Sequence, residues 1–179
     1  YRFGFMKNSD ISFFFLSQMI LPPVLLALPF LVLYKSLGLL DSRIGLILLY
    51  TLMVLPIVIW IMRDQFQGIP IELEEAALVD GLGIWGAFLQ IVMPIALPGM
   101  VAAFILSLVL CWNEYFFAAL LTSTNATTLP VMVASQTGSQ GINWWSMAAL
   151  SSAAILPLVI VAIVLEKYII KGMAAGAVK

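Results

Sequence analysis

Two groups of side chains in this 179-residue sequence could take part in polar chemistry. Asn113 and Glu114 interrupt an apolar stretch, where an amide and a carboxylate can hydrogen-bond the hydroxyl groups of a solute. The second group is an acidic run that can start a helix or pair with cations, and it comprises Asp64, Glu72, Glu74, Glu75 and Asp80. Because the chain has no histidine and a single cysteine, we expect no catalytic residue, no metal site and no internal disulfide.

The composition places these groups in a membrane protein. The chain is 63% hydrophobic and 9% charged, whereas soluble chains are about 45–50% apolar and about 25% charged. The net charge of −1 leaves no basic surface for nucleic acid. We interpret residues 1–179 as a single transmembrane domain whose amino-terminal part is missing, because the chain opens at Tyr1 without a signal-peptide pattern.

Four apolar stretches are long enough to cross a bilayer, and they comprise residues 11–34, 44–62, 99–121 and 147–165. As helices they would each measure about 28–36 Å, against a hydrocarbon core of about 30 Å. Prolines bend such helices, and the first stretch holds three of them, at Pro22, Pro23 and Pro29. The predicted fold is therefore an all-α integral membrane protein, a bundle of kinked transmembrane helices.

The distribution of lysine and arginine predicts the orientation. Residues 122–146 carry no charge, whereas the tail, residues 166–179, carries Lys167, Lys171 and Lys179. Cytoplasmic loops hold the excess of these residues. We therefore expect a multi-pass membrane protein with a cytoplasmic carboxyl terminus, an outer loop at 122–146 and a cytoplasmic loop at 63–98.

The cytoplasmic loop is predicted to form two short helices around a glycine corner. Pro70 suits the first position of a helix, and the glutamates that follow it fall where the helix dipole favours negative charge. Gly81 and Gly83 can end that helix and turn the chain. A second helix is expected at about residues 84–91, ended by Pro94. Such a small knob could enter a groove on another protein.

The residue spacing of this loop resembles a known signature. Glu75-Ala76-Ala77, Gly81, Ile91 and Pro94 fit the pattern E-A-A-x3-G-x9-I-x-L-P, with Met93 in place of leucine. This pattern is typical of permease subunits of binding-protein-dependent ABC importers. Three wider stretches resemble the carbohydrate-uptake branch, which includes the smaller permease subunit of the maltose transporter: residues 69–81, 112–115 and 168–179.

The resemblance implies a function and a set of partners. Such a permease lies in the cytoplasmic (inner) membrane and moves a sugar across it by alternating access. It works with a second permease subunit, two cytoplasmic ATPase subunits and an extracytoplasmic binding protein. It is not an enzyme and binds no cofactor, because ATP and Mg²⁺ belong to the ATPase subunits. The implied ATPase-coupling residues of this coupling loop are Glu75, Ala76, Ala77, Asp80, Gly81, Ile91 and Pro94.

Several alternatives stay open at this point. Asn113 and Glu114 could line the solute pathway, or Glu114 could bond a neighbouring helix and hold the bundle together. The chain could instead be an ATP-independent channel or a secondary carrier, although Glu114 is the only ionisable residue within the predicted spans. Within the importer class, the solute could be an oligosaccharide, a disaccharide, a polyol or something other than a sugar.

Overall fold

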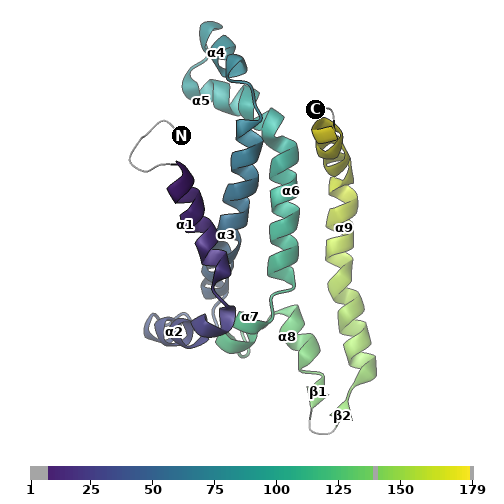
Figure 1. Ribbon diagram of the computed structural model, residues 1–179. Helices are drawn as coiled ribbons and strands as arrows, with labels where there is room; N and C mark the ends of the chain where they lie inside the picture. Colours follow the sequence, from purple (N-terminus) through teal and green to yellow (C-terminus); the bar gives the residue numbers. More distant parts are fainter. Residues whose placement is uncertain (1–7, 139–140, 178–179) are drawn as a thin grey trace. The chain divides into compact units, whose positions relative to one another are not determined.

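The computed structural model describes residues 8–138 and 141–177, and this part of the chain is mostly helical, with two very short strands and the turns that connect the elements (Figure 1). Strands β1 (Thr137–Gly138) and β2 (Gly141–Ile142) pair in antiparallel fashion. The expected all-α fold class is confirmed. The helices are α1 (Asn8–Ile20), α2 (Pro23–Ser36), α3 (Arg43–Gln67), α4 (Ile71–Val79), α5 (Ile84–Ala87), the π-helical η1 (Phe88–Val92), α6 (Met93–Trp112), α7 (Phe116–Leu121), α8 (Leu129–Ala134) and α9 (Trp144–Ala177).

Among the described residues, three helices are long and apolar enough to cross a membrane. They are Arg43–Gln67 with 25 residues, the continuous run Ile84–Trp112 with 29, and Trp144–Glu166 with 23. At 1.5 Å per residue even the shortest measures about 34 Å, which exceeds a hydrocarbon core of about 30 Å. The predicted spans 44–62 and 147–165 lie inside the first and the third of these helices.

The first predicted span, residues 11–34, is two helices rather than one kinked helix. Phe13–Ile20 and Pro23–Ser36 are bent by 94° relative to each other, and together they could form a fourth, broken span. Pro22 between them is extended, with φ −61° and ψ 130°. The physical reason is that a residue before proline avoids the α conformation, and Pro22 is followed directly by Pro23. Pro29, by contrast, lies inside α2 without ending it.

The third predicted span, residues 99–121, also differs from the structure at both ends. The helix begins at Ile84 and runs through Pro94 without stopping, and it ends at Trp112. A proline ring clashes with the carbonyl four residues earlier in a regular α-helix. Before Pro94, however, the helix is π-helical, and the Met93 N–H donates to the Phe88 carbonyl five residues back. We attribute the continuation of the helix to this wider turn.

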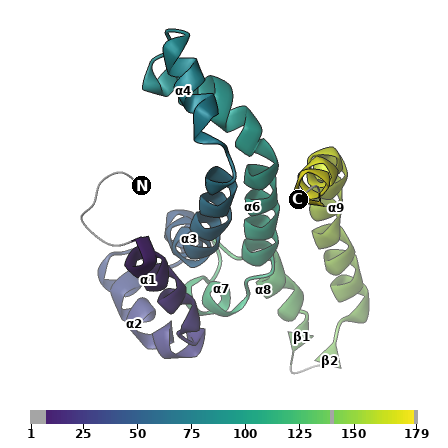
Figure 2. The same ribbon diagram turned by 45° about the horizontal axis from the view of Figure 1, so that its top comes forward.

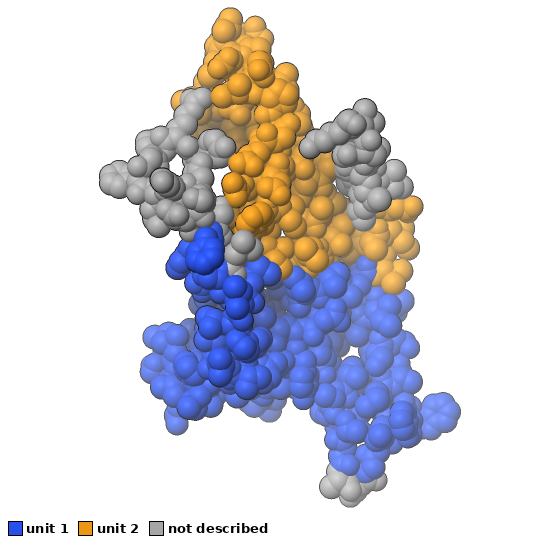
Figure 3. Space-filling view, viewed as in Figure 1, with its two compact units in different colours: residues 1–56, 109–158 blue, residues 57–108, 159–179 orange. Residues whose placement is uncertain are grey.

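The chain forms two compact units, which Figure 3 distinguishes by colour. Unit 1 comprises residues 1–56 and 109–158, and its core contains Tyr34, Leu49, Phe117 and Leu121 from α2, α3 and α7. The Tyr34 hydroxyl donates to the Gly45 carbonyl at 2.9 Å. Any side chain at Gly45 would lie 2.6 Å from the Leu39 carbonyl oxygen, so only glycine permits this close approach of backbone.

Unit 2 comprises residues 57–108 and 159–179. Its core is formed by Ile69, Val92 and Ala96, with Met62 and Phe88 packed against it. The loop before α4 and the η1 turn therefore share one cluster of buried apolar side chains. This cluster supports the α4–α5 corner on the end of α6.

Apolar side chains also cover much of the surface of the described residues. Leu28 on α2, Ile47 on α3, Phe104 on α6 and Ile163 on α9 are all exposed. So many exposed large apolar side chains are unusual for a soluble monomer. The exposed side chains fit an environment of lipid tails or of another apolar protein surface.

Candidate functional site

Helix α4 begins the region where the sequence predicts a coupling surface. The helix starts at Ile71, one residue after Pro70, and Glu72 and Glu74 lie in its first turn as expected. The unpaired backbone N–H groups of a first helical turn carry partial positive charge, so the two carboxylates are favourably placed there. Three negative side chains therefore project from a helix of nine residues, the third being Glu75.

The helix ends in a Schellman motif built around Gly81. The Leu82 N–H donates to the Ala77 carbonyl at 3.0 Å, and the Gly81 N–H donates to the Leu78 carbonyl at 3.2 Å. These two bonds define the motif, and it requires a left-handed residue after the helix cap. Gly81 supplies this conformation with φ +91°. The expected glycine corner is therefore present, and the short α5 and then η1 follow α4 along the chain; α4 is labelled in Figure 2.

The corner exposes most of the predicted coupling residues. Glu75, Ala76, Asp80, Gly81 and Pro94 are exposed, and Ile91 is partly buried. Ala77 differs, because its side chain is only 5% exposed and packs inside unit 2. Its small side chain therefore packs within this chain. The coupling role of the seven residues itself stays a prediction.

Three large apolar side chains beside the corner were not singled out from the sequence. Val79 is 87% exposed, Ile84 78% and Trp85 77%. We define the corner surface as the exposed residues Glu75, Ala76, Val79, Asp80, Gly81, Ile84 and Trp85. Apolar and acidic groups side by side on an open corner suit a groove with an apolar floor and a cationic rim. The signal that could have found these residues is their position next to the two glycines.

Asn113 and Glu114 lie at the break between α6 and α7. The Glu114 Oε1 accepts from the Phe117 N–H at 2.9 Å, and its Oε2 accepts from the Ala118 N–H at 3.1 Å. Oε2 also accepts from the Tyr50 hydroxyl of α3 at 3.0 Å. Glu114 thus caps the first turn of α7 and bonds a neighbouring helix, as the structural alternative requires. Tyr50 was not identified from the sequence.

Asn113 has different surroundings. Its side chain is exposed, and its Nδ2 donates to the Val109 carbonyl one turn earlier at 2.8 Å. The amide therefore lies at the surface of unit 1, whereas both oxygens of Glu114 already accept bonds from the chain. A role of either residue in a solute pathway stays a prediction.

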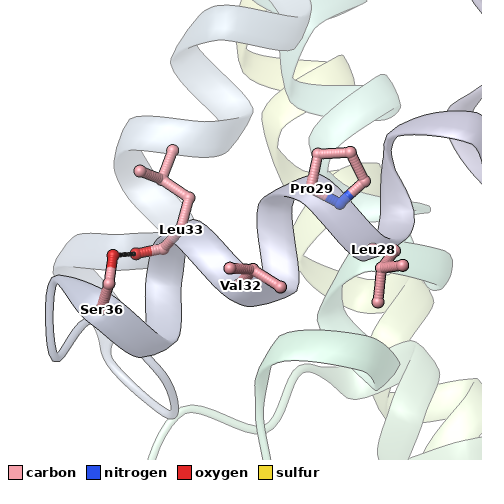
Figure 4. Close-up of a pocket in the computed structure, with 5 residues that line it drawn as sticks. All are labelled: Leu28, Pro29, Val32, Leu33 and Ser36. Carbon is pink, nitrogen blue, oxygen red and sulfur yellow. Dashed lines mark hydrogen bonds between the residues drawn. The ribbon is translucent and has the colours of Figure 1, made fainter.

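A hollow on α2 does not offer a second site for a polar solute. It is lined by Leu28, Pro29, Val32, Leu33 and Ser36 (Figure 4). The Ser36 hydroxyl donates to the Leu33 carbonyl of the same helix at 2.8 Å. Ligand sites for polar molecules need several converging polar groups, which these five side chains do not supply. Among the described residues, no group of three or more Cys, Asp or Glu side chains is placed to hold a metal ion.

Comparison with known proteins identifies relatives along nearly the whole chain. The family described as "Binding-protein-dependent transport system inner membrane component" matches residues 5–175. The trehalose transport system permease protein of Mycobacterium tuberculosis is 35% identical over 161 residues, covering 88% of this chain and 59% of the relative. The trehalose/maltose transport system permease protein of Thermococcus litoralis is 35% identical over 147 residues, covering 81% of this chain and 53% of the relative.

A solved structure shares the fold. A chain of a bacterial ABC transporter involved in the import of the acidic polysaccharide alginate matches with a TM-score of 0.65 at 23% identity. The match covers 93% of this chain and 64% of that chain. The 179 residues thus span between about half and two-thirds of the length of the proteins they resemble.

Proposed function

This chain belongs to the family of binding-protein-dependent transport system inner membrane components, and we propose that it is the permease subunit of an ATP-driven importer that carries a sugar across the cytoplasmic membrane. Family membership confirms the resemblance based on Glu75, Ala76, Ala77 and Gly81. The sugar class is supported by two relatives, whose names assign them to trehalose and to trehalose or maltose transport. The proposed mechanism is alternating access between inward-open and outward-open states.

The observation that carries the coupling part of the proposal is the exposed corner surface. Its acidic residues and its apolar residues are presented together at a turn that Gly81 makes sharp. We assign this surface to the cytoplasmic side and propose that it docks into a groove of a separate ATPase subunit. Glu75 and Asp80 would face cationic or donor groups at the rim, and Trp85 would fill an apolar part of the groove.

The helix that follows the corner supports a direct mechanical link. From Ile84 the chain stays helical without a loop, through η1 and into α6. Phe88, Val92 and Ala96 of this helix pack in one cluster with Ile69, which precedes α4. A displacement of the corner by an ATPase subunit would therefore move the end of a membrane-spanning helix as a rigid element, without first straightening a flexible connection. The unbroken helix at Pro94 is what makes this link short.

The remaining partners follow from the family. We assign ATP binding and hydrolysis, with Mg²⁺, to two cytoplasmic ATPase subunits, so this chain performs no covalent chemistry. A second permease subunit would complete the pathway, and an extracytoplasmic binding protein would deliver the solute to the outer loop. The carboxyl terminus is proposed to be cytoplasmic. Within the pathway, Asn113 is the better candidate for a solute contact, since its amide is exposed.

Reconstitution tests the proposal directly. The complete transporter is placed in liposomes with and without its ATPase subunits, and uptake of labelled trehalose is measured with the binding protein outside. Uptake is expected only when ATP and the ATPase subunits are present together. Uptake that persists without them would identify a channel or a secondary carrier. ATP-dependent uptake of a different solute, without uptake of trehalose, would support the assignment as an importer and show that trehalose is not its substrate.

A further inference from the structure

Asp41, in the turn between α2 and α3, holds a segment that lies more than eighty residues further along the chain. Its Oδ1 accepts from the backbone N–H groups of Ser123 at 2.9 Å, Asn125 at 3.1 Å and Ala126 at 3.1 Å. Its Oδ2 accepts from the Thr124 N–H at 3.2 Å. Four consecutive backbone donors thus converge on one carboxylate. We call this arrangement the Asp41 clasp.

Side chains of the same segment add to the clasp. The Thr124 hydroxyl donates to Oδ2 at 3.2 Å, and the Asn125 Nδ2 donates to it at 3.0 Å. The segment is also closed on itself, because the Thr127 hydroxyl donates to the Ser123 carbonyl at 3.0 Å. Successive backbone N–H groups that point at one anion form an anion nest. Here the anion is supplied by the chain itself.

The backbone of Asp41 is part of the same connection. Its N–H donates to the Leu121 carbonyl at the end of α7, at 2.8 Å. Its φ of +51° lies in the left-handed region, which costs most residues about 1–2 kcal/mol and which aspartate and asparagine tolerate best. A single residue therefore bonds the end of α7 through its backbone and the following segment through its side chain.

The clasp holds a carboxylate rather than a carboxylic acid. The N–H bonds, that of Ser123 first, keep the pKa of Asp41 well below its ordinary value of 3.8. Hydrogen bonds to a charged acceptor are stronger than bonds to a neutral one. The connection is thus polar and specific for an ionised group, although Asp41 lies at the surface of unit 1.

We propose that Asp41 is a positioning residue that fixes the start of the outer loop, residues 122–146, to the turn between α2 and α3. The clasped segment leads directly into α8, so the clasp sets the direction in which that loop leaves the bundle. This inference rests on the proposed function, in which the outer loop meets the binding protein. A loop held in one conformation loses less conformational entropy when the binding protein docks, and this raises the affinity of docking.

The first test measures how strongly the clasp protects the backbone amides, and it does not depend on transport. Hydrogen exchange is measured on the complete transporter carrying Asp41→Asn, which keeps the tolerance for a left-handed backbone but removes the charge. The amides of residues 123–126 are expected to exchange about tenfold faster than in the wild type. The matched control is Ser123→Ala, which keeps the backbone donor and should leave exchange unchanged. Equal exchange in Asp41→Asn and the wild type would overturn the clasp.

The second test measures whether the clasp affects docking of the binding protein. The binding-protein concentration that half-saturates ATP hydrolysis is expected to rise about fivefold in Asp41→Asn, while the rate at saturation is retained. Thr124→Val, which removes a single donor and is expected to assemble normally, should shift half-saturation in the same direction by less. Faster exchange at residues 123–126 with an unchanged half-saturation would overturn the positioning role. If the wild type shows no ATP-dependent uptake, the proposed function fails while the exchange result still decides the clasp.

Discussion

The corner surface of unit 2 and the Asp41 clasp of unit 1 both fix the path of the backbone at a turn, but they do so by opposite means. At the corner, the bonds that close the turn join residues no more than five positions apart, from Ala77 to Leu82. In the clasp, the bonds join Asp41 to residues 82 to 85 positions later. A turn closed by local bonds can form wherever its few residues are present, whereas the clasp exists only once distant segments have met.

The difference also concerns what each turn exposes. At Gly81 no atom lies within 4 Å of the place where a side chain would begin, so the corner is open to a partner. In the clasp, the backbone donors point inward at the carboxylate and are already used. The corner therefore leaves its outer face free for the proposed contact, whereas the clasp holds two segments of the chain together.

The largest expected effect comes from Gly81→Asp, which puts a charged side chain on the open face of the corner. ATP-driven uptake should fall about tenfold or more, a loss that lies within the usual range of coupling free energies between two sites. The transporter should still assemble, and the ATPase subunits should retain basal hydrolysis. Uptake and hydrolysis are measured on the same liposomes. Wild-type uptake in this variant would show that the corner is not a contact surface, and the contrast with the clasp would be lost.

Glu114→Gln probes a residue that takes part both in local bonds and in a bond between segments distant in the sequence. It would lose a charged acceptor for the Phe117 and Ala118 amides and for the Tyr50 hydroxyl, so we expect destabilisation of about 1.5–3 kcal/mol. Thermal unfolding of the purified transporter measures this, and Tyr50→Phe, which removes only the distant bond, should cost about 0.5–1.5 kcal/mol. Uptake is then compared at limiting and saturating solute. A changed apparent affinity without loss of assembly would favour the solute pathway over the structural role.

Gly81→Ala should have a smaller effect, because the space is open and only the backbone is strained. The left-handed conformation costs a residue with a side chain about 1–2 kcal/mol. Gly83→Ala is the matched control, since Gly83 is equally open but has an ordinary φ of −71°. Coupling of uptake to hydrolysis should weaken in the first variant and change little in the second. Equal effects would mean that side-chain volume, rather than the turn, matters at the corner.

The smallest expected effect is that of acid on the clasp. Because the folded pKa of Asp41 is lowered, its contribution to stability is fully present above its ordinary pKa of 3.8 and is lost only as the pH falls toward the lowered value. Exchange protection at residues 123–126, corrected for intrinsic rates, should therefore be the same at about pH 7 and about pH 5. Protection that disappears by about pH 5 would contradict an ionised clasp.

Much of the fold could be predicted from the sequence because the relevant forces act locally. Stretches of about twenty apolar residues form helices in a bilayer, where each backbone group must bond within its own segment. The helix start after Pro70 and the turn at Gly81 likewise depend only on neighbouring residues. The consecutive prolines at 22 and 23 signalled a disturbance, although only the structure shows that the helix breaks there.

The details that were missed depend on neighbours distant in the sequence. Nothing in the spacing of Asn113 and Glu114 indicates that Tyr50, 64 residues away, donates to Glu114. Ala77 has the same residue type as Ala76, yet it packs inside unit 2 while Ala76 is exposed. Which face of a short helix is covered is decided by the elements packed against it.

The sequence by itself determined that this chain is a helical membrane protein of the importer permease family, because composition, helix length and the spacing from Glu75 to Pro94 are properties of contiguous residues. Only the tertiary structure decided that the Asp41 carboxylate bonds the backbone of residues 123–126 and that Glu114 caps α7. Those contacts require segments that are tens of residues apart in the sequence to meet. The free energy that brings them together comes from the packing of the whole unit, so no short sequence pattern predicts them.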